Sequence, residues 1–189
     1  MAIAADVLDF WFGTAQARGK ARREWYRKDP AFDEEIRRGF GALLEAAANR
    51  ELEAWRATPA SMLALVVVLD QFSRNLFRED PRAFAQDAYA RECAREAIAR
   101  GDESVLLPVE RQFLYMPFEH SESLADQELA LERMASLEAC PETQGLVEYA
   151  RRHEAVIRRF GRFPHRNAAL GRASTPGEIE FLEQPGSRF

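Results

Sequence analysis

Apolar stretches along this chain are separated by helix start and stop signals, not by the tight turns that join strands. No alternating β-branched run and no Asn-Gly or Asp-Gly pair occurs, so hairpin signals are missing. Four dipeptides place a capping side chain before a proline at the first helical position: Asp29-Pro30, Thr58-Pro59, Asp80-Pro81 and Thr175-Pro176. The pattern predicts helices over residues 4–12, 30–49, 59–77, 81–100, 108–118, 123–138, 144–160 and 176–183.

The sequence therefore predicts an all-α fold of about eight helices. Ala, Leu, Glu and Arg dominate the composition, and these residues favour helices. The connections are short, so successive helices are expected to pack as antiparallel hairpins. No linker divides the chain, and we expect a single helical domain over residues 1–189.

Composition and charge exclude several classes of protein. The net charge of −5 argues against a nucleic-acid-binding protein. The longest apolar run, Met62 to Leu69, is far shorter than the ~20 residues of a membrane span. The N-terminus lacks a targeting signal, and Cys93 and Cys140 have no C-x-x-C spacing. We therefore expect a cytoplasmic protein without a disulfide framework, a membrane partner or a nucleic-acid partner.

The predicted helix 59–77 changes character along its length. Its first part is apolar all round, as in a helix buried on every side. Polar residues then occupy an arc of about 140° on a helical wheel: Asp70, Gln71, Arg74 and Asn75. Two interpretations stay open: an Asp70–Arg74 pair that caps an exposed helix end, or a buried polar network, of which contact with a ligand is a special case.

A second polar segment lies between Leu106 and Ser123. Glu110, Arg111 and Gln112 interrupt an apolar helix, which Pro117 is expected to break. The following loop contains Glu119, His120, Ser121 and Glu122. A histidine between carboxylates is a candidate general acid or base. The alternative is a solvated connection in which a serine caps the next helix.

A third segment, 160–175, supplies donors between turn residues. Its glycines and proline set turns, and it contains Arg162, His165, Arg166, Asn167 and Arg172. Guanidinium groups of this kind suit a carboxylate or a phosphate. The alternative is that these arginines pair with the surplus acids of the chain.

Several common functional motifs are missing. The chain has no Gly-rich nucleotide loop and no G-x-S-x-G elbow. Its three histidines, His120, His153 and His165, lack the spacing of a metal site. We therefore predict no metal and no cofactor.

At these three segments the sequence resembles a bacterial family known as domain of unknown function 924. The resemblance rests on L-D-Q-F-S-R-N-L-F-R (69–78), E-R-Q-F-L-Y-M-P-F-E-H-S-E (110–122) and F-G-R-F-P-H-R-N-A-A-L-G-R-A-S-T (160–175), with V-L-D-F-W-F-G (7–13) and A-F-A-Q-D (83–87) in agreement. It implies an all-helical, tetratricopeptide-like fold, but no established activity or cofactor. Ser73 and Glu119 depart from the pattern, in which proline and methionine are common. A carboxylate at 119 argues against a tight apolar wall around His120.

Three hypotheses for function follow from these segments. The first is a binding module whose polar pocket holds an anionic small molecule or an acidic peptide. The second is an enzyme that acts on an anionic substrate with His120 or His165 as acid or base. The third is a protein-interaction module in which the polar residues only lock helices together. The candidate catalytic residues are His120, Glu122 and His165, and the candidate binding residues are Asp70, Gln71, Arg74, Asn75, Glu110, Arg111, Ser121, Arg166 and Asn167.

Overall fold

The computed structural model describes residues 2–14 and 16–187, and in these ranges it contains helices and turns but no strand. The α-helices are α1 (Ala4–Phe12), α2 (Pro30–Ala48), α3 (Pro59–Val67), α4 (Ser73–Leu76), α5 (Asp87–Arg100), α6 (Pro108–Glu119), α7 (Leu124–Ala135), α8 (Leu146–Phe160) and α9 (Pro176–Leu182). The all-α prediction is confirmed.

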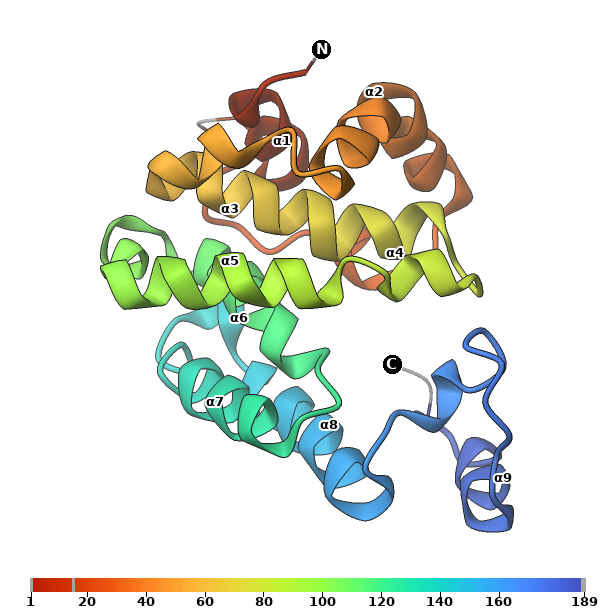
Figure 1. Ribbon diagram of the computed structural model, residues 1–189. Coiled ribbons are helices and arrows are strands. Elements are labelled where there is room, and N and C mark those ends of the chain that lie inside the picture. The colour runs from red at the N-terminus through yellow and green to blue at the C-terminus, as the bar shows by residue number, and fades with distance from the viewer. Residues whose placement is uncertain (1, 15, 188–189) are drawn as a thin grey trace.

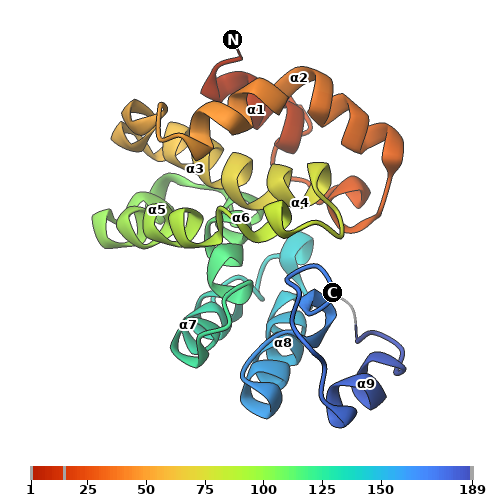
Figure 2. The same cartoon turned by 45° about the vertical axis from the view of Figure 1, so that its right-hand side comes forward.

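The helices form two groups that α6 connects (Figures 1 and 2). Helices α1 to α5 make one group, which we call the N-terminal layer. Helix α6 leaves this layer and leads into the α7–α8 hairpin. The chain after α8, residues 161–187, forms a C-terminal arm that includes α9 and comes back toward α4. The three polar segments thus meet where the layer, the hairpin and the arm adjoin.

Helix ends form where the capping signals place them. The Asp29 side chain accepts hydrogen bonds from the first turn of α2. The Thr175 hydroxyl accepts from the N–H of Glu178 at 3.3 Å, and the Glu178 carboxylate accepts from the Thr175 N–H at 2.7 Å. Gly101 and Gly161 end α5 and α8 in the left-handed conformation, which glycine adopts without a steric penalty.

Helix α3 forms the centre of the main hydrophobic core. Every residue from Met62 to Leu69 is fully buried, as the apolar run predicts. A smaller apolar cluster of Val156, Ile157 and Phe163 joins α8 to the arm. The arm therefore has its own small apolar attachment in addition to polar contacts.

Two local features differ from the sequence prediction. Between α3 and α4 the chain forms a π-helical turn, Val68–Phe72, so residues 59–76 wind less tightly there than a regular α-helix. Pro117 does not break α6, which continues to Glu119. The N–H of His120 donates to the carbonyl of Met116 at 2.9 Å, so the hydrogen bonding lost at the proline resumes within one turn. His120 is therefore the C-cap of α6 and not part of a free loop.

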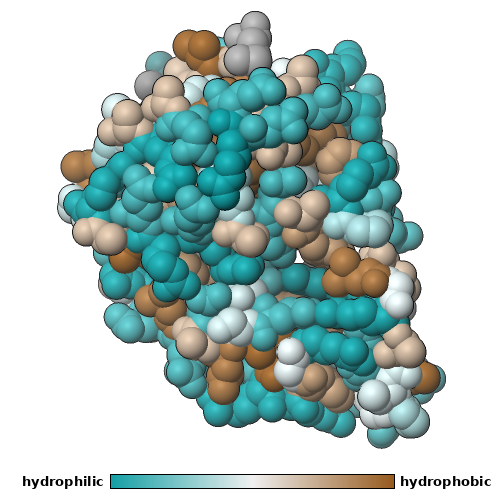
Figure 3. Space-filling model, viewed as in Figure 1, coloured by the Kyte–Doolittle hydropathy of each residue, from teal (hydrophilic) through white to brown (hydrophobic). Residues whose placement is uncertain are grey.

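Among the described residues, no helix is long and apolar enough to cross a membrane. On the face shown in Figure 3, hydrophobic residues are scattered over a mostly hydrophilic surface. Cys93 and Cys140 are both free thiols.

Candidate functional site

A buried carboxylate–imidazole pair lies at the junction of α6 and the π-helical turn. His120 Nδ1 is 2.9 Å and 3.0 Å from the two carboxylate oxygens of Asp70, which is fully buried. The Gln71 amide donates to the same carboxylate at 2.6 Å. Arg74 contacts it at 3.0 Å and donates to the Asp70 carbonyl at 2.9 Å. Three neighbours thus fix Asp70, which orients His120.

Burial and neighbouring charges determine which atoms of Asp70 and His120 carry protons. Burial favours the neutral acid, but the charge of Arg74 and the His120 hydrogen bond outweigh it and hold the pKa of Asp70 below its usual value. Burial and the Arg74 charge lower the pKa of His120. Because an ionised carboxylate only accepts hydrogen bonds, Nδ1 of His120 carries the proton. Nε2 is therefore the basic nitrogen of a neutral imidazole.

An alternating row of charges leads from this pair to the C-terminal arm. Arg74 donates to both carboxylate oxygens of Asp87, the first residue of α5, at 2.9 and 3.0 Å. Arg166, in the 3₁₀ turn η7 (Pro164–Arg166), donates to Asp87 at 3.3 Å. The row His120–Asp70–Arg74–Asp87–Arg166 joins all three polar segments of the sequence.

The other two histidines lie beside this row. The ring of His153 on α8 is 6.5 Å from that of His120 and 5.6 Å from Phe163, and Phe163 is 5.5 Å from His165. Burial lowers the pKa of His153 to about 3. Burial and the neighbouring Arg166 charge lower the pKa of His165 to about 3. All three histidines of the chain therefore gather, uncharged, in one region.

Glu119 is a second buried acid at the site, and its charge state differs from that of Asp70. It is 4 % exposed, and its carboxyl oxygen lies 3.4 Å from Nδ1 of His153. Burial and the negative charge of Asp70 raise the pKa of Glu119 to about 8, although Arg152 opposes this shift. Glu119 is therefore protonated at neutral pH. The carboxyl group next to His120 in the chain is therefore uncharged at neutral pH.

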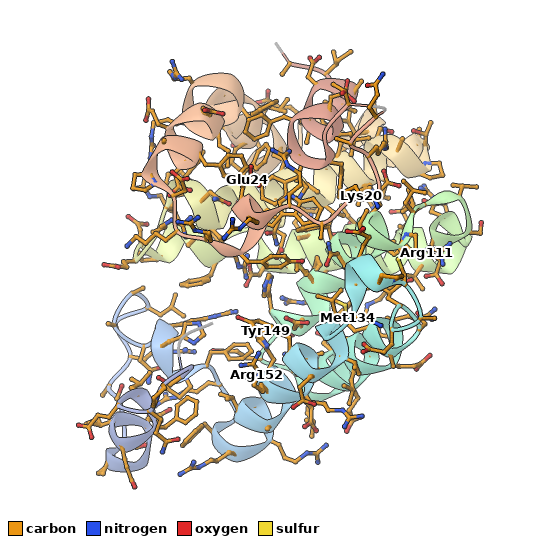
Figure 4. The ribbon with its side chains drawn as sticks, turned by 180° about the vertical axis from the view of Figure 1, so that it is seen from behind. Lys20, Glu24, Arg111, Met134, Tyr149 and Arg152 are labelled. Atoms are coloured by element: carbon orange, nitrogen blue, oxygen red, sulfur yellow. The ribbon has the colours of Figure 1, made fainter. Side chains whose placement is uncertain are left out.

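Solvent reaches the region along one edge. The side chain of His120 is 15 % exposed and that of Arg74 is 19 % exposed. Tyr149 and Arg152 project from α8 beside the space between the N-terminal layer and the C-terminal arm (Figure 4). The guanidinium of Arg152 lies 4.4 Å above the Tyr149 ring. His120 and Arg74 are therefore the partly exposed members of the charged row.

Two predicted binding residues lie at the opposite end of α6. Glu110 accepts from Arg18 at 2.7 Å and from the N–H of Leu107 at 2.9 Å. Arg111 donates to the carbonyl of Leu106 at 2.9 Å. Both precede His120 by at least nine residues, about 13 Å along a helix, and Arg111 lies well away from Tyr149 in Figure 4. The structure does not bring them to the site.

The remaining predicted residues hold elements together. Asn75 donates to Asp33 of α2 at 2.7 Å, because the π-helical turn changes the direction that a regular wheel gives it. Ser121 donates to Asp126 of α7 at 2.7 Å. Their polar atoms lock α4 to α2 and the α6–α7 turn to α7.

Glu122 and Asn167 have a similar locking role in the arm. Glu122 accepts two hydrogen bonds from Arg172, at 2.7 and 2.9 Å, and one from the N–H of Phe163 at 2.8 Å. Asn167 bonds to Arg172 at 2.9 Å and to Ser174 at 3.0 Å. Glu122 is thus engaged in the arm, and Asp70 is the carboxylate that orients His120.

Three residues of the site were not among the predicted site residues: Asp87, Glu119 and His153. Asp87 ends the A-F-A-Q-D segment that the resemblance includes, so a signal for it was present. His153 lies on the buried face of α8 with Ala150, Val156 and Ile157. A polar residue on an apolar helix face was the available signal. Within the described part of the chain, no group of three or more His, Cys, Asp or Glu residues could hold a metal ion.

Comparison with known proteins gives a clear family. A family model described as "Bacterial protein of unknown function (DUF924)" matches residues 7–186. The chain belongs to this family. A solved structure, that of a protein of unknown function from Agrobacterium tumefaciens, is similar to this chain: the two are 40% identical, with a TM-score of 0.85 and coverage of 95% of this chain and 96% of the other. A comparison with curated proteins gives no match. DUF924 membership thus extends over nearly the whole chain without supplying an activity.

Proposed function

We propose that this DUF924 protein is an enzyme that moves a proton on a small anionic substrate, with His120 as the acid–base group. The observation that carries the proposal is the hydrogen bond from His120 to the buried, ionised Asp70. A carboxylate in this position fixes the imidazole tautomer and stabilises the imidazolium that forms when the ring takes up a proton. Clusters of perturbed pKa values are typical of reactive sites.

The geometry suits His120 as the base at neutral pH. Its lowered pKa keeps the ring uncharged, so Nε2 holds an available lone pair. Asp70 cannot turn away from the ring, because Arg74 and Gln71 hold its carboxylate. When Nε2 takes a proton from the substrate, the new positive charge lies beside the Asp70 carboxylate, and the reverse step returns that proton to the product.

The charge balance supports an anionic substrate. The carboxylates of Asp70 and Asp87 face the guanidinium groups of Arg74 and Arg166. Glu119 and the three histidines are uncharged at neutral pH, and Arg152 adds a positive charge at the edge. With Glu122 paired to Arg172, this region therefore holds one more guanidinium group than carboxylates, which favours one further negative charge. Because Arg166 is only 5 % exposed, a small molecule fits this role better than an acidic peptide.

A substrate screen tests this proposal. The protein is incubated in D2O with mono-, di- and tricarboxylates and phosphate esters, and ¹H NMR follows new products and the loss of exchangeable C–H signals. We expect one anion class to be converted, and His120→Asn to abolish the conversion while the protein stays folded. Arg111→Ala, at the other end of α6, is the matched control and should convert as the wild type does. Binding without conversion, or conversion that survives in His120→Asn, would overturn the proposal.

A further inference from the structure

Arg166 differs from the other arginines of the C-terminal arm in how its donors are used. Arg162 donates to the Glu178 carboxylate at 2.6 and 2.8 Å. Arg172 makes the equivalent pair of hydrogen bonds to Glu122. Among the residues that the structure describes, Arg166 makes one long hydrogen bond, from NH1 to Asp87 at 3.3 Å, and its buried Nε has no hydrogen-bond partner there. A buried donor without a partner costs free energy. An acceptor atom of a ligand at this nitrogen would remove that cost.

The guanidinium group of Arg166 is also held rigidly. Its guanidinium carbon lies 4.7 Å from the centroid of the Phe84 ring in η4 (Pro81–Phe84) and 4.5 Å from the centroid of the Phe163 ring in the arm. Two aromatic faces and the Asp87 contact fix the plane of the guanidinium. The direction of the Nε–H bond is thereby set before a ligand arrives, which lowers the entropic cost of binding.

We propose that Arg166 binds the carboxylate group of the substrate through its Nε edge. This inference rests on the proposed function, because it names the anionic group that the Asp70–His120 pair acts beside. The Nε edge of a guanidinium presents N–H donors in a plane that matches the two oxygens of a carboxylate. Arg166 is connected to His120 through Asp87, Arg74 and Asp70.

The charge around Arg166 favours a carboxylate over a phosphate. Asp87 already takes a hydrogen bond from Arg166, and Glu122 and Asp70 are also close enough to act on its charge. A doubly charged phosphate would bring more negative charge than the one that the site can accept. Burial and the neighbouring Arg74 charge lower the pKa of Arg166 to about 10, so a single carboxylate would relieve the shortage of negative charge around it.

Binding of simple carboxylates tests this assignment without any turnover. Acetate, succinate, benzoate and inorganic phosphate are titrated into the protein, and NMR follows the Nε–H resonance of Arg166. We expect at least one carboxylate to shift this resonance and to bind more tightly than phosphate. Arg166→Gln should weaken that carboxylate about tenfold or more, as expected for loss of a charge-assisted hydrogen bond. Arg166→Lys should also weaken it, because lysine keeps the charge but lacks the planar fork.

Two control variants separate this proposal from the proposed function. Arg111→Gln removes an arginine far from the site and should leave carboxylate binding unchanged. His120→Asn should keep carboxylate binding while it loses conversion, so a protein that binds carboxylates but converts none contradicts only the proposed enzyme. Thermal melts confirm that each variant is folded. Carboxylate binding that is unchanged in folded Arg166→Gln, preferential binding of phosphate, or no binding by the wild type would each overturn the assignment.

Discussion

The two ends of α6 carry similar residues, but the partners of these residues differ. Near its start, Glu110 is an ionisable acid that accepts hydrogen bonds from Arg18 and from the N–H of Leu107, and the neighbouring Arg111 caps the preceding turn. At its end, Glu119 is a buried acid with a pKa raised to about 8, and the neighbouring His120 pairs with Asp70. A carboxylate with donors around it stabilises the fold, whereas one without enough donors is held protonated beside the reactive histidine. The two glutamates are the same residue type, so the difference between the start of α6 and its end beside His120 comes from their contacts.

We expect the largest loss of stability when the Asp70 carboxylate, which pairs with Arg74 and His120 at the end of α6, is removed. Asp70→Asn removes the carboxylate between Arg74 and His120 and leaves the Arg74 charge with Asp87 alone. Loss of one partner from a buried pair costs about 3–5 kcal/mol, which lowers the Tm of a domain of this size by roughly 6–20 °C. Calorimetric melting checks this. A loss of less than about 1 kcal/mol would show that the pair does not hold the junction.

Glu119→Gln and Glu110→Gln should change the free energy of unfolding in opposite directions. Unfolded Glu119 ionises near its usual pKa, but folded Glu119 keeps its proton up to about pH 8. Its contribution to stability is therefore greatest below about pH 4.5 and falls as the pH rises to about 8. Glu119→Gln removes this loss, so the variant should match the wild type near pH 5 and become more stable toward pH 8. The difference should grow by up to about 1.4 kcal/mol per pH unit.

Measuring this difference by denaturant unfolding at several pH values cancels the contributions of the other titrating groups. The groups that act on Glu119 or contact it are Asp70, Arg152, His153 and Tyr26, and His120 follows it in the chain. A difference that does not change with pH would mean that Glu119 is ionised in the folded protein.

Glu110→Gln should destabilise the protein instead. The substitution replaces a buried carboxylate that accepts from Arg18 and the Leu107 N–H with an amide that accepts more weakly. Hydrogen bonds to charged groups contribute about 1.5–3 kcal/mol, and we expect a loss in this range at pH 7 by denaturant unfolding. A gain in stability, like that expected for Glu119→Gln, would remove the contrast between the two ends.

The smallest effect is expected at Arg111. Arg111→Ala loses one hydrogen bond to the Leu106 carbonyl, which contributes about 1 kcal/mol. Carboxylate binding should not change, because Arg111 lies outside the site. Isothermal titration of the variant beside the wild type checks both statements, and a tenfold loss of affinity would place Arg111 in the binding site after all.

The sequence predicts the helices well, because their signals are local. The N-caps, the glycine stops and the apolar run from Met62 to Leu69 lie within the elements that they define. The exceptions are also local but depend on geometry. A π-helical turn precedes Asn75, which contacts α2, and Pro117 is tolerated two residues before the end of α6.

The candidate site is harder to predict, because its contacts join residues that are far apart in the chain. Asp70, Asp87, His120 and Arg166 come from four elements and meet only after folding. The sequence indicates the three segments but not which acid pairs with which base. Glu122 lies two residues from His120 in the sequence, and only packing assigns it to Arg172. Likewise, a fully paired arginine such as Arg162 and an incompletely paired one such as Arg166 look alike in the sequence.

The central claim is that His120 is a neutral base whose proton is held on Nδ1 by Asp70. Long-range ¹H–¹⁵N NMR of the imidazole nitrogens at pH 7, with His120 assigned by comparison with His120→Asn, tests it without a substrate. We expect a neutral His120 ring with the proton on Nδ1 and a lone pair on Nε2. A charged imidazolium, or a neutral ring with its proton on Nε2, would show that His120 does not act as the base.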